Sequence, residues 1–286
     1  MLKLILLINL FFSHPPDEYF VAHIHGKIYH SGTNNVIKLG EKINLDQALD
    51  FTTESDFLAV ISPARGRFLI RKNKGGKRSS APRILVAISD NLVPATLPQT
   101  LAGRGNVNSP ADLKMMFNNL AKKQQDTLVN ILLIDSVKLE LEGAGFNERD
   151  SKFFFIRYDF SREAINKKLN FMPGTNLKEL FLVIDKGIFL VDGKSIDPGL
   201  TSNLQLFYYN ASERSSDLIG KIKIILVEKN IILQEIGILQ KNLRILYEGK
   251  KNQNELIRDA IFSELENNYG YIDRVNILAL LSTIKN

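Results

Sequence analysis

Histidines are the side chains of this sequence best suited to metal or proton chemistry, and all of them lie before residue 31. His23 and His25 are two positions apart in an apolar run, so a β-strand would place both imidazoles on one face. Two imidazoles can begin a metal site, but a site needs a third ligand, for which Asp17 and Glu18 are nearby donors. Because the sequence shows no complete ligand set, we expect these histidines to be exposed on a strand and to bind no metal.

Three carboxylates are the best candidates for acid–base catalysis: Asp135, Glu140 and Glu142. A glycosidase-type pair can be built from acids on neighbouring strands, and Glu140 and Glu142 would share one face of a strand. Alternating acids of this kind are more often the solvated side of a strand, and nothing in the sequence marks a perturbed environment around them. We expect no catalytic residue here.

Standard nucleotide-binding motifs each fail at one position. Gly193-Lys194-Ser195 would end a phosphate-binding loop, but Ile188 occupies the place of its first glycine. Gly143 and Gly145 would begin a dinucleotide fingerprint, but Glu148 replaces the third glycine. The chain has no cysteine, which excludes disulfides, thiolate nucleophiles and cysteine-ligated metals. The sequence predicts a protein that is not an enzyme and holds no cofactor; an enzyme whose site matches no standard motif is an alternative.

A basic stretch is the clearest binding signal in the chain. Its eight Lys and Arg residues, with no acid between them, are Arg65, Arg67, Arg71, Lys72, Lys74, Lys77, Arg78 and Arg83. Such a run typically forms a solvated linker or hairpin loop, and the alternative is a patch that follows the phosphates of a nucleic acid or binds another anionic polymer. Phe68 is the only aromatic residue in the stretch, so a base-stacking platform is missing there.

The composition is that of a folded protein with a modest basic excess. Its 286 residues suffice for one large or about two to three ordinary domains, and 44% hydrophobic with 24% charged residues excludes global disorder. The net charge of +6 leaves a nucleic acid or an anionic surface open as a partner. The positions of the basic residues in the chain are therefore a better guide to the partner than the size of the net charge.

The first residues resemble a targeting signal. Lys3 is followed by a mostly apolar run through Phe12, which is typical of a secretory signal peptide and too short to span a bilayer as a helix. Phe11 is too bulky for a good cleavage site after Ser13, so a retained β-strand is the alternative. We expect a leader over residues 1–18 and an exported or periplasmic protein that is not an integral membrane protein; the alternative location is cytoplasmic.

Residues 19–72 alternate short apolar runs with turn residues. Each run has four to eight residues rich in β-branched and aromatic side chains, and Gly, Asn, Ser, Asp or Pro separates it from the next. The pattern predicts about five short strands, the first of them within residues 19–30 and the next within 36–43, in a small all-β unit. A basic linker and a Pro/Gly/Asn-rich loop follow over residues 73–108.

This β-unit resembles the FecR-type β-domain. The resemblance lies in Gly26 at the end of the first strand, Leu39-Gly40-Glu41-Lys42-Ile43, Phe51-Thr52-Thr53, Phe57–Ile61 and Gly66–Ile70. The resemblance implies a periplasmic, β-rich module of bacterial envelope signalling. The sequence lacks the transmembrane helix and anti-sigma segment of the signalling members, so their regulatory role does not carry over. The remainder resembles only uncharacterised bacterial exported proteins.

Residues 109–227 predict a helix followed by a β-sandwich. Ser109 is an N-cap, Pro110 suits the first helical position and Asp112 the first turn. The expected strands are 128–134, 137–141, 152–158, 180–184, 187–191 and 204–209. Residues 161–169 fit a short helix or a strand, and 218–227 fit a strand. The spacing of the strands suggests an immunoglobulin-like arrangement.

Residues 228–286 predict a helical C-terminal segment. Asn230 and Asn254 are expected to cap helices over 231–247 and 255–269, Gly270 to end the second, and Asp273 to open a third. The fold class is therefore α+β: a small N-terminal all-β unit, a central antiparallel β-sandwich and C-terminal helices.

Three hypotheses for function follow. The first is a non-enzymatic protein–protein interaction or structural module of an envelope-associated or exported assembly, with an unidentified protein partner. The second is a nucleic-acid or anionic-polymer binder that uses the basic stretch 65–83. The third is an enzyme with a site of no standard motif. We favour the first, because every catalytic template fails.

Overall fold

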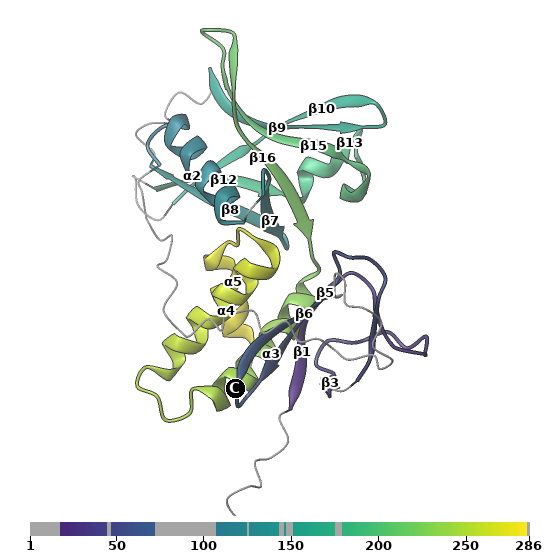
Figure 1. The fold of residues 1–286 in the computed structure, drawn as a ribbon. Coiled ribbons are helices and arrows are strands. Elements are labelled where there is room, and N and C mark those ends of the chain that lie inside the picture. The colour runs from purple at the N-terminus through teal and green to yellow at the C-terminus, as the bar shows by residue number, and fades with distance from the viewer. Residues whose placement is uncertain are drawn as a thin grey trace, which may run out of the picture. The chain divides into compact units, whose positions relative to one another are not determined.

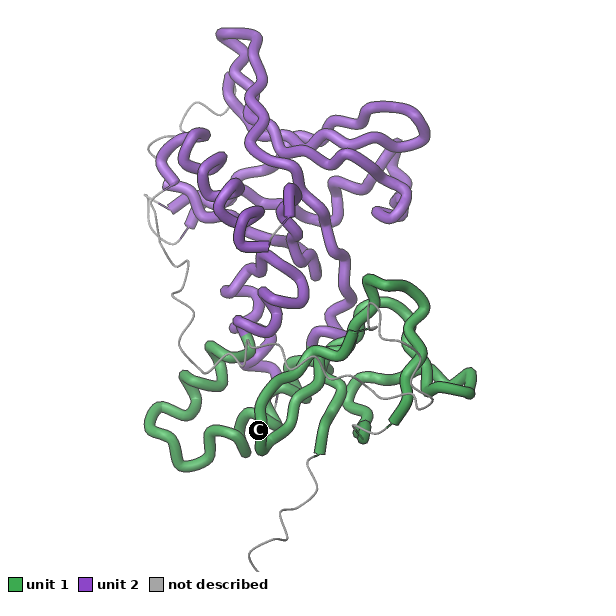
Figure 2. The backbone as a smooth tube through the Cα atoms, in the orientation of Figure 1, with its two compact units in different colours: residues 1–96, 233–261 green, residues 97–232, 262–286 purple. Residues whose placement is uncertain are grey.

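The structure is a computed structural model that describes residues 18–44, 47–71, 107–124, 126–142, 146, 151–174 and 179–284. The fold is mixed α+β and mostly β, with four α-helices in the described part of the chain (Figure 1). The chain forms two compact units (Figure 2): unit 1 contains residues 1–96 and 233–261, and unit 2 contains residues 97–232 and 262–286.

Short antiparallel strands build most of unit 1. They are β1 (Tyr19–His25), β2 (Ile28–His30), β3 (Lys42–Ile43), β4 (Leu49–Phe51), β5 (Phe57–Ser62) and β6 (Gly66–Arg71). Four of them form a sheet in the order β3-β1-β5-β6, and β2 pairs with β4. Alternate apolar residues of β1 and β5, among them Val21, Leu58 and Val60, are buried in one cluster.

Two glycines determine where strands of unit 1 begin and end. Gly26, at which the sequence predicts the end of the first strand, follows β1 directly with a φ of +83°, and a Cβ there would lie 2.0 Å from Asp56 Oδ1. The expected strand 36–43 is reduced to Lys42–Ile43, because Gly40 turns the chain with a φ of +76°.

Two sheets and a helix build unit 2. Its elements include α2 (Pro110–Lys123), β7 (Val129–Leu133), β8 (Ser136–Glu142), β9 (Lys152–Phe160), β10 (Glu163–Lys168), β11 (Asn170–Pro173), β12 (Glu179–Asp185), β15 (Ser202–Asn210) and β16 (Ser215–Leu226). The larger sheet has the order β10-β9-β15-β16-β7, in which only β16 and β7 are parallel, and the smaller has the order β11-β12-β8. Ser109 caps α2 as predicted, because its side chain accepts a hydrogen bond from the Asp112 amide.

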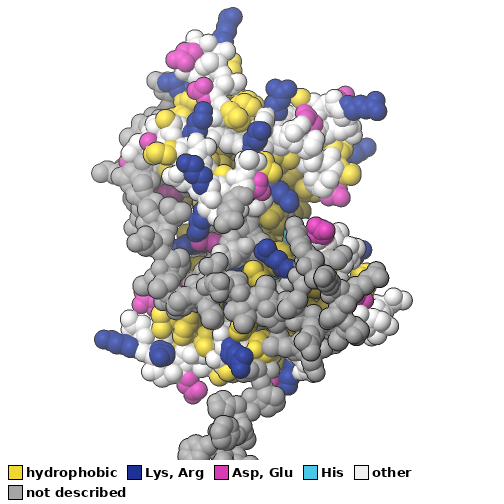
Figure 3. Space-filling view, viewed as in Figure 1, with side chains coloured by type: hydrophobic (Ala, Val, Ile, Leu, Met, Phe, Trp, Pro, Cys, Tyr) yellow, Lys and Arg dark blue, Asp and Glu magenta, His cyan; other side chains and the backbone are white. Residues whose placement is uncertain are grey.

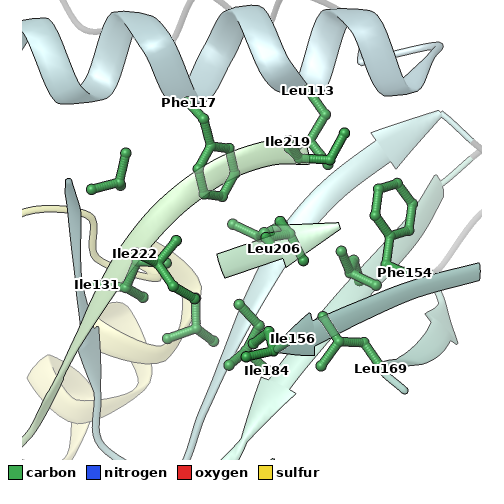
Figure 4. Packing of buried hydrophobic residues seen from close by; sticks show 14 of the residues in the cluster. Leu113, Phe117, Ile131, Phe154, Ile156, Leu169, Ile184, Leu206, Ile219 and Ile222 are labelled. Atoms are coloured by element: carbon green, nitrogen blue, oxygen red, sulfur yellow. The ribbon is translucent and has the colours of Figure 1, made fainter. Parts of the chain in front are cut away.

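The core of unit 2 lies on one face of the larger sheet. Figure 4 shows Leu113 and Phe117 of α2 directed at Ile219 and Leu206 of the sheet. Phe117 fits because position 220 is glycine: a Cβ at Gly220 would lie 2.8 Å from the ring. Apolar residues of β8 and β12 belong to the same buried cluster, so α2 and both sheets share one core.

Three expectations for unit 2 can be compared with its strands. Residues 161–169, which fitted a helix or a strand, form β10, and residues 218–227 lie largely in β16. The strand expected at 187–191 is wrong: residues Lys186–Phe189 form a 3₁₀ turn, and only β13 (Leu190–Val191) is extended. The cause is Asp185, whose carboxylate accepts the Gly187 N–H at 2.7 Å and caps the turn.

The C-terminal helices are α3 (Lys229–Leu246), α4 (Gln253–Tyr269) and α5 (Arg274–Thr283). Gly270 ends α4 with a φ of +87°, and Asp273 caps α5 by accepting the N–H groups of Val275 and Asn276, as the sequence predicts. The expected single segment 228–286 is divided: residues 233–261 belong to unit 1 and residues 262–286 to unit 2. Within the described residues, no helix is long and apolar enough to cross a membrane.

Candidate functional site

The basic stretch is only partly described. Arg65, Arg67 and Arg71 lie on the hairpin of β5 and β6, and Arg71 is exposed with its guanidinium 5.4 Å from the centre of the Phe57 ring. His25 stacks on the same ring at 5.1 Å, so His25, Phe57 and Arg71 form a row across three strands. The remaining members of the stretch, Lys72, Lys74, Lys77, Arg78 and Arg83, lie outside the described residues.

The histidines do not share one environment. His25 is exposed, but the expectation of an exposed strand histidine is wrong for His23, which is 4% exposed. His23 Nδ1 lies 2.9 Å from Glu235 Oε1 of α3 in a buried hydrogen bond. Both residues belong to unit 1, and α3 covers this position of β1. Within the described residues, no group of three or more His, Asp or Glu side chains could hold a metal ion.

The candidate carboxylates lie at the surface of unit 2. Asp135 is exposed and its carboxylate lies 3.1 Å from Lys186 Nζ. Glu140 is exposed on β8 and Glu142 is half-buried at the end of the same strand. Among the described residues, the structure does not bring these acids together with a buried base. Glu140 lies on the exposed side of β8, and Asp135 precedes that strand.

Four aromatic rings lie on the face of the larger sheet that is turned away from the core. Phe154, Ile156 and Tyr158 of β9 are buried in the core, so their neighbours Phe153 and Phe155 point to the opposite face. On β15, Leu206 is buried in the core and alternates in the same way with Phe207 and Tyr209. All four rings are half-buried, and none of them belongs to the core cluster or packs against it.

The register of β9 and β15 places these rings in two adjacent pairs. Phe155 is opposite Phe207, and their rings are stacked with centroids 5.2 Å apart and planes 10° apart. Phe153 is opposite Tyr209, with ring centroids 5.0 Å apart. The centroids of Phe153 and Phe155, in neighbouring pairs on one strand, are 6.3 Å apart. The rings therefore form a continuous aromatic surface.

Positive charge lies beside this aromatic surface. The outward positions of β9, β10, β15 and β16 carry four basic side chains, Arg157, Lys168, Lys221 and Lys223, all exposed. Lys168 places its ammonium group 4.8 Å from the centre of the Phe153 ring. Asp159 is the one acid on these outward positions, and the amide of Asn203 donates to it at 2.7 Å. We call the four rings and four bases the aromatic–basic face.

A run of three consecutive phenylalanines is the feature of the sequence that points to this face, although it was not among the candidate site residues. Phe153, Phe154 and Phe155 are consecutive, and a strand must direct at least one of three consecutive side chains to each face. Which side carries the extra rings depends on where α2 and the smaller sheet pack. Figure 3 shows Lys and Arg side chains interspersed with hydrophobic ones over unit 2.

Comparison with known proteins adds no family to this description. No family model, no curated protein and no solved structure matches the chain. The function is therefore inferred from the residues and geometry of the chain itself.

Proposed function

We propose that unit 2 binds nucleic acid through the aromatic–basic face, without catalysis. The observation that carries the proposal is the set of four rings that lie outside the core, beside four exposed cations. Lys and Arg neutralise phosphates, and aromatic rings offer flat surfaces to bases, so the two kinds of side chain together match the two parts of a nucleotide.

A structural role alone accounts poorly for these rings. Leaving apolar surface in water forgoes about 25 cal/mol for each square ångström that burial would remove. Outward positions of a half-exposed antiparallel sheet are usually polar, as Gln205 and Ser216 are here. A ligand that covers the rings would recover this free energy.

Nucleic acid fits the face better than an anionic polysaccharide does. Three of the four rings are phenylalanine, which has no hydroxyl or N–H group to bond sugar hydroxyls. A base needs only the ring surface, whereas the cations suit the phosphates. The second hypothesis from the sequence, nucleic-acid binding, is therefore retained, but its main site moves from residues 65–83 to β9, β10, β15 and β16.

A salt series with matched charge variants tests the proposal. Binding of a fluorescent oligonucleotide is measured by anisotropy between low and physiological salt. The face variant combines Arg157→Ser, Lys168→Ser, Lys221→Ser and Lys223→Ser. The control variant removes the same net charge from exposed sites elsewhere and combines Lys114→Ser, Lys194→Ser, Lys241→Ser and Lys250→Ser.

We expect the face variant to bind more weakly. The slope of log K against log salt concentration should also become shallower, by about 0.7 for each phosphate contact removed. The control variant should keep most of the wild-type affinity and slope. Equal losses in the two variants would show that only net charge acts and would contradict the proposal. Equal affinity of the wild type for heparin and for the oligonucleotide would contradict the assignment to nucleic acid.

The interaction-module hypothesis stays as a second proposal, supported by apolar side chains on the surface of α5. Val275 is 63% exposed and Leu278 is 44% exposed. This proposal includes three expectations from the sequence. They are a FecR-type β-domain over residues 19–72, an immunoglobulin-like arrangement of the central strands, and export directed by residues 1–13. The mass of the protein recovered from cells tests the export step: loss of residues 1–13 supports it, and an intact N-terminus contradicts it.

A further inference from the structure

We infer that the ligand of the aromatic–basic face is a single strand, whose unpaired bases stack on the four rings while its phosphates lie beside the four cations. The inference rests on the proposed nucleic-acid binding and narrows it from nucleic acid in general to the unpaired form. It is carried by the arrangement of the rings rather than by the charge.

The four rings and three of the four cations lie in three parallel rows of outward side chains across the sheet. The first row contains Phe153, Tyr209 and Ser216, and the second contains Lys168, Phe155, Phe207 and Leu218. The third contains Asn166, Arg157, Gln205 and Lys221. Two rows are therefore aromatic, and the third, beside them, offers two cations and two amides.

The distance between the two aromatic rows favours unpaired bases. The rings of Phe153 and Phe155 have centroids 6.3 Å apart. Successive bases of a duplex are stacked about 3.4 Å apart along the helix axis. One base on each row must therefore leave the helical stack, and a single strand can extend in this way without breaking base pairs.

A duplex would offer these rings little to bind. Both faces of each paired base are covered by its neighbours, and opening a step for an apolar side chain costs about a few kcal/mol. The four cations would still attract duplex phosphates, but the rings would remain in water. We therefore expect the face to bind a single strand more tightly than a duplex, and the rings to account for the difference in affinity.

The chemistry of the rings also predicts tolerance of base sequence. Three are phenylalanine, and only the Tyr209 hydroxyl can form a hydrogen bond. Stacking on aromatic side chains is available to every base, because each has a π-face. We expect preference for unpaired over paired strands to exceed any preference among bases.

The first test compares one oligonucleotide alone and annealed to its complement. We expect wild-type protein to bind the single strand at least tenfold more tightly than the duplex at the same salt concentration. The ring variant is Phe155→Leu with Phe207→Leu, which keeps apolar side chains on the strands and removes two aromatic faces. We expect it to lose about tenfold or more in affinity for the single strand and little for the duplex.

A matched control uses a ring on the other sheet. Phe181 of β12 is half-buried and, like the four rings, lies outside the core cluster of unit 2. Phe181→Leu should leave single-strand affinity within about twofold of wild type. Hydrogen exchange of β9 and β15 amides in each variant shows whether the sheet itself is intact.

The second test reads stacking directly. An oligonucleotide with 2-aminopurine in place of one base changes its fluorescence when that base moves from its neighbours onto a protein ring. We expect the 2-aminopurine fluorescence to change when the oligonucleotide binds to wild-type protein, and we expect no such change with the ring variant. The variant lacking Arg157, Lys168, Lys221 and Lys223 should still give the change, once its concentration is high enough to restore binding.

The outcomes separate the two levels of the proposal. Equal affinity for both forms of nucleic acid, with loss only in the charge variant, overturns the single-strand inference and leaves nucleic-acid binding in place. Absence of binding to either form at low salt overturns both.

Discussion

His23 and Glu235 are 212 positions apart in the chain, yet their side chains form a buried hydrogen bond. Neither residue is unusual in its own segment: His23 stands in an apolar strand and Glu235 in an amphipathic helix. A buried polar pair of this kind stabilises the fold only while both members are present, because loss of either one leaves the other buried without this hydrogen bond. In unit 1 the pair therefore fixes how α3 lies on β1.

Removing the carboxylate tests the importance of this pair. We expect Glu235→Ala to lower the free energy of unfolding by about 3 kcal/mol, because the substitution removes the buried carboxylate that is hydrogen-bonded to His23. Urea denaturation followed by circular dichroism measures the change. Glu228→Ala, at an exposed position just before α3, is the control and should stay within about 0.5 kcal/mol of wild type. A similarly small change for Glu235→Ala would show that the pair is dispensable.

Asp56 gives a pH-dependent prediction. The Thr53 hydroxyl, at 2.5 Å, and the Thr53 backbone N–H, at 2.8 Å, donate to its carboxylate and hold the pKa of Asp56 below its ordinary value. Because the folded pKa is the lower one, this stabilisation is present above the unfolded-state pKa and disappears as the pH falls through the folded pKa. Thr53→Ala removes the larger cause, so we expect the carboxyl titration midpoint, followed by NMR, to rise. Identical midpoints in the two proteins would contradict this account.

At the scale of the elements, α5 is attached to β8 through its cap. The Asp273 carboxylate accepts the N–H groups of Val275 and Asn276 and also the Lys138 N–H of β8, at 3.1 Å. The neighbouring Tyr271 hydroxyl donates to the Lys138 carbonyl at 3.3 Å. Burial, reinforced by Asp273, raises the pKa of Tyr271 above its ordinary value, so the hydroxyl keeps the proton that it donates.

Asp273→Ala should loosen this attachment. We expect a loss of about 1 to 2 kcal/mol, since an N-cap is removed and the Lys138 N–H loses its acceptor. Hydrogen exchange should accelerate at the Lys138, Val275 and Asn276 amides. Asp217→Ala, at an exposed strand position, is the control. Unchanged exchange at Lys138 in Asp273→Ala would show that the cap does not hold β8.

The strands β9 and β15 show how one element can serve two purposes. Their inward residues belong to the core with α2, and their outward residues make the aromatic–basic face. A substitution on the outward side can therefore change binding without changing the core, which is why the ring variants separate the two effects.

At the scale of the whole molecule, the C-terminal helices do not form a segment of their own. Residues 233–261 complete unit 1, where Glu235 meets His23, and residues 262–286 complete unit 2, where Asp273 meets β8. The net charge of +6 is likewise not confined to the stretch 65–83, since four bases lie on the aromatic–basic face.

The sequence by itself determined the local elements. Alternation predicted β8, β9, β12 and β15 to within a few residues, and Ser109, Gly270 and Asp273 marked helix ends, because caps and strand periodicity depend on neighbouring residues. The α+β class and its β-rich character followed from them. Gly26 marks the end of β1, as predicted, whereas Gly40 shortens the strand expected at 36–43, since a positive φ breaks the extended backbone.

Only the tertiary structure decided which face of each strand is covered. The burial of His23 depends on α3, and the outward position of Phe153 and Phe155 depends on α2 and the smaller sheet packing on the opposite side. These contacts join residues that are far apart in the chain and lie on different elements. Strand periodicity separates the two faces of a strand but does not say which one meets the core, so the aromatic–basic face became visible only once the sheets were packed.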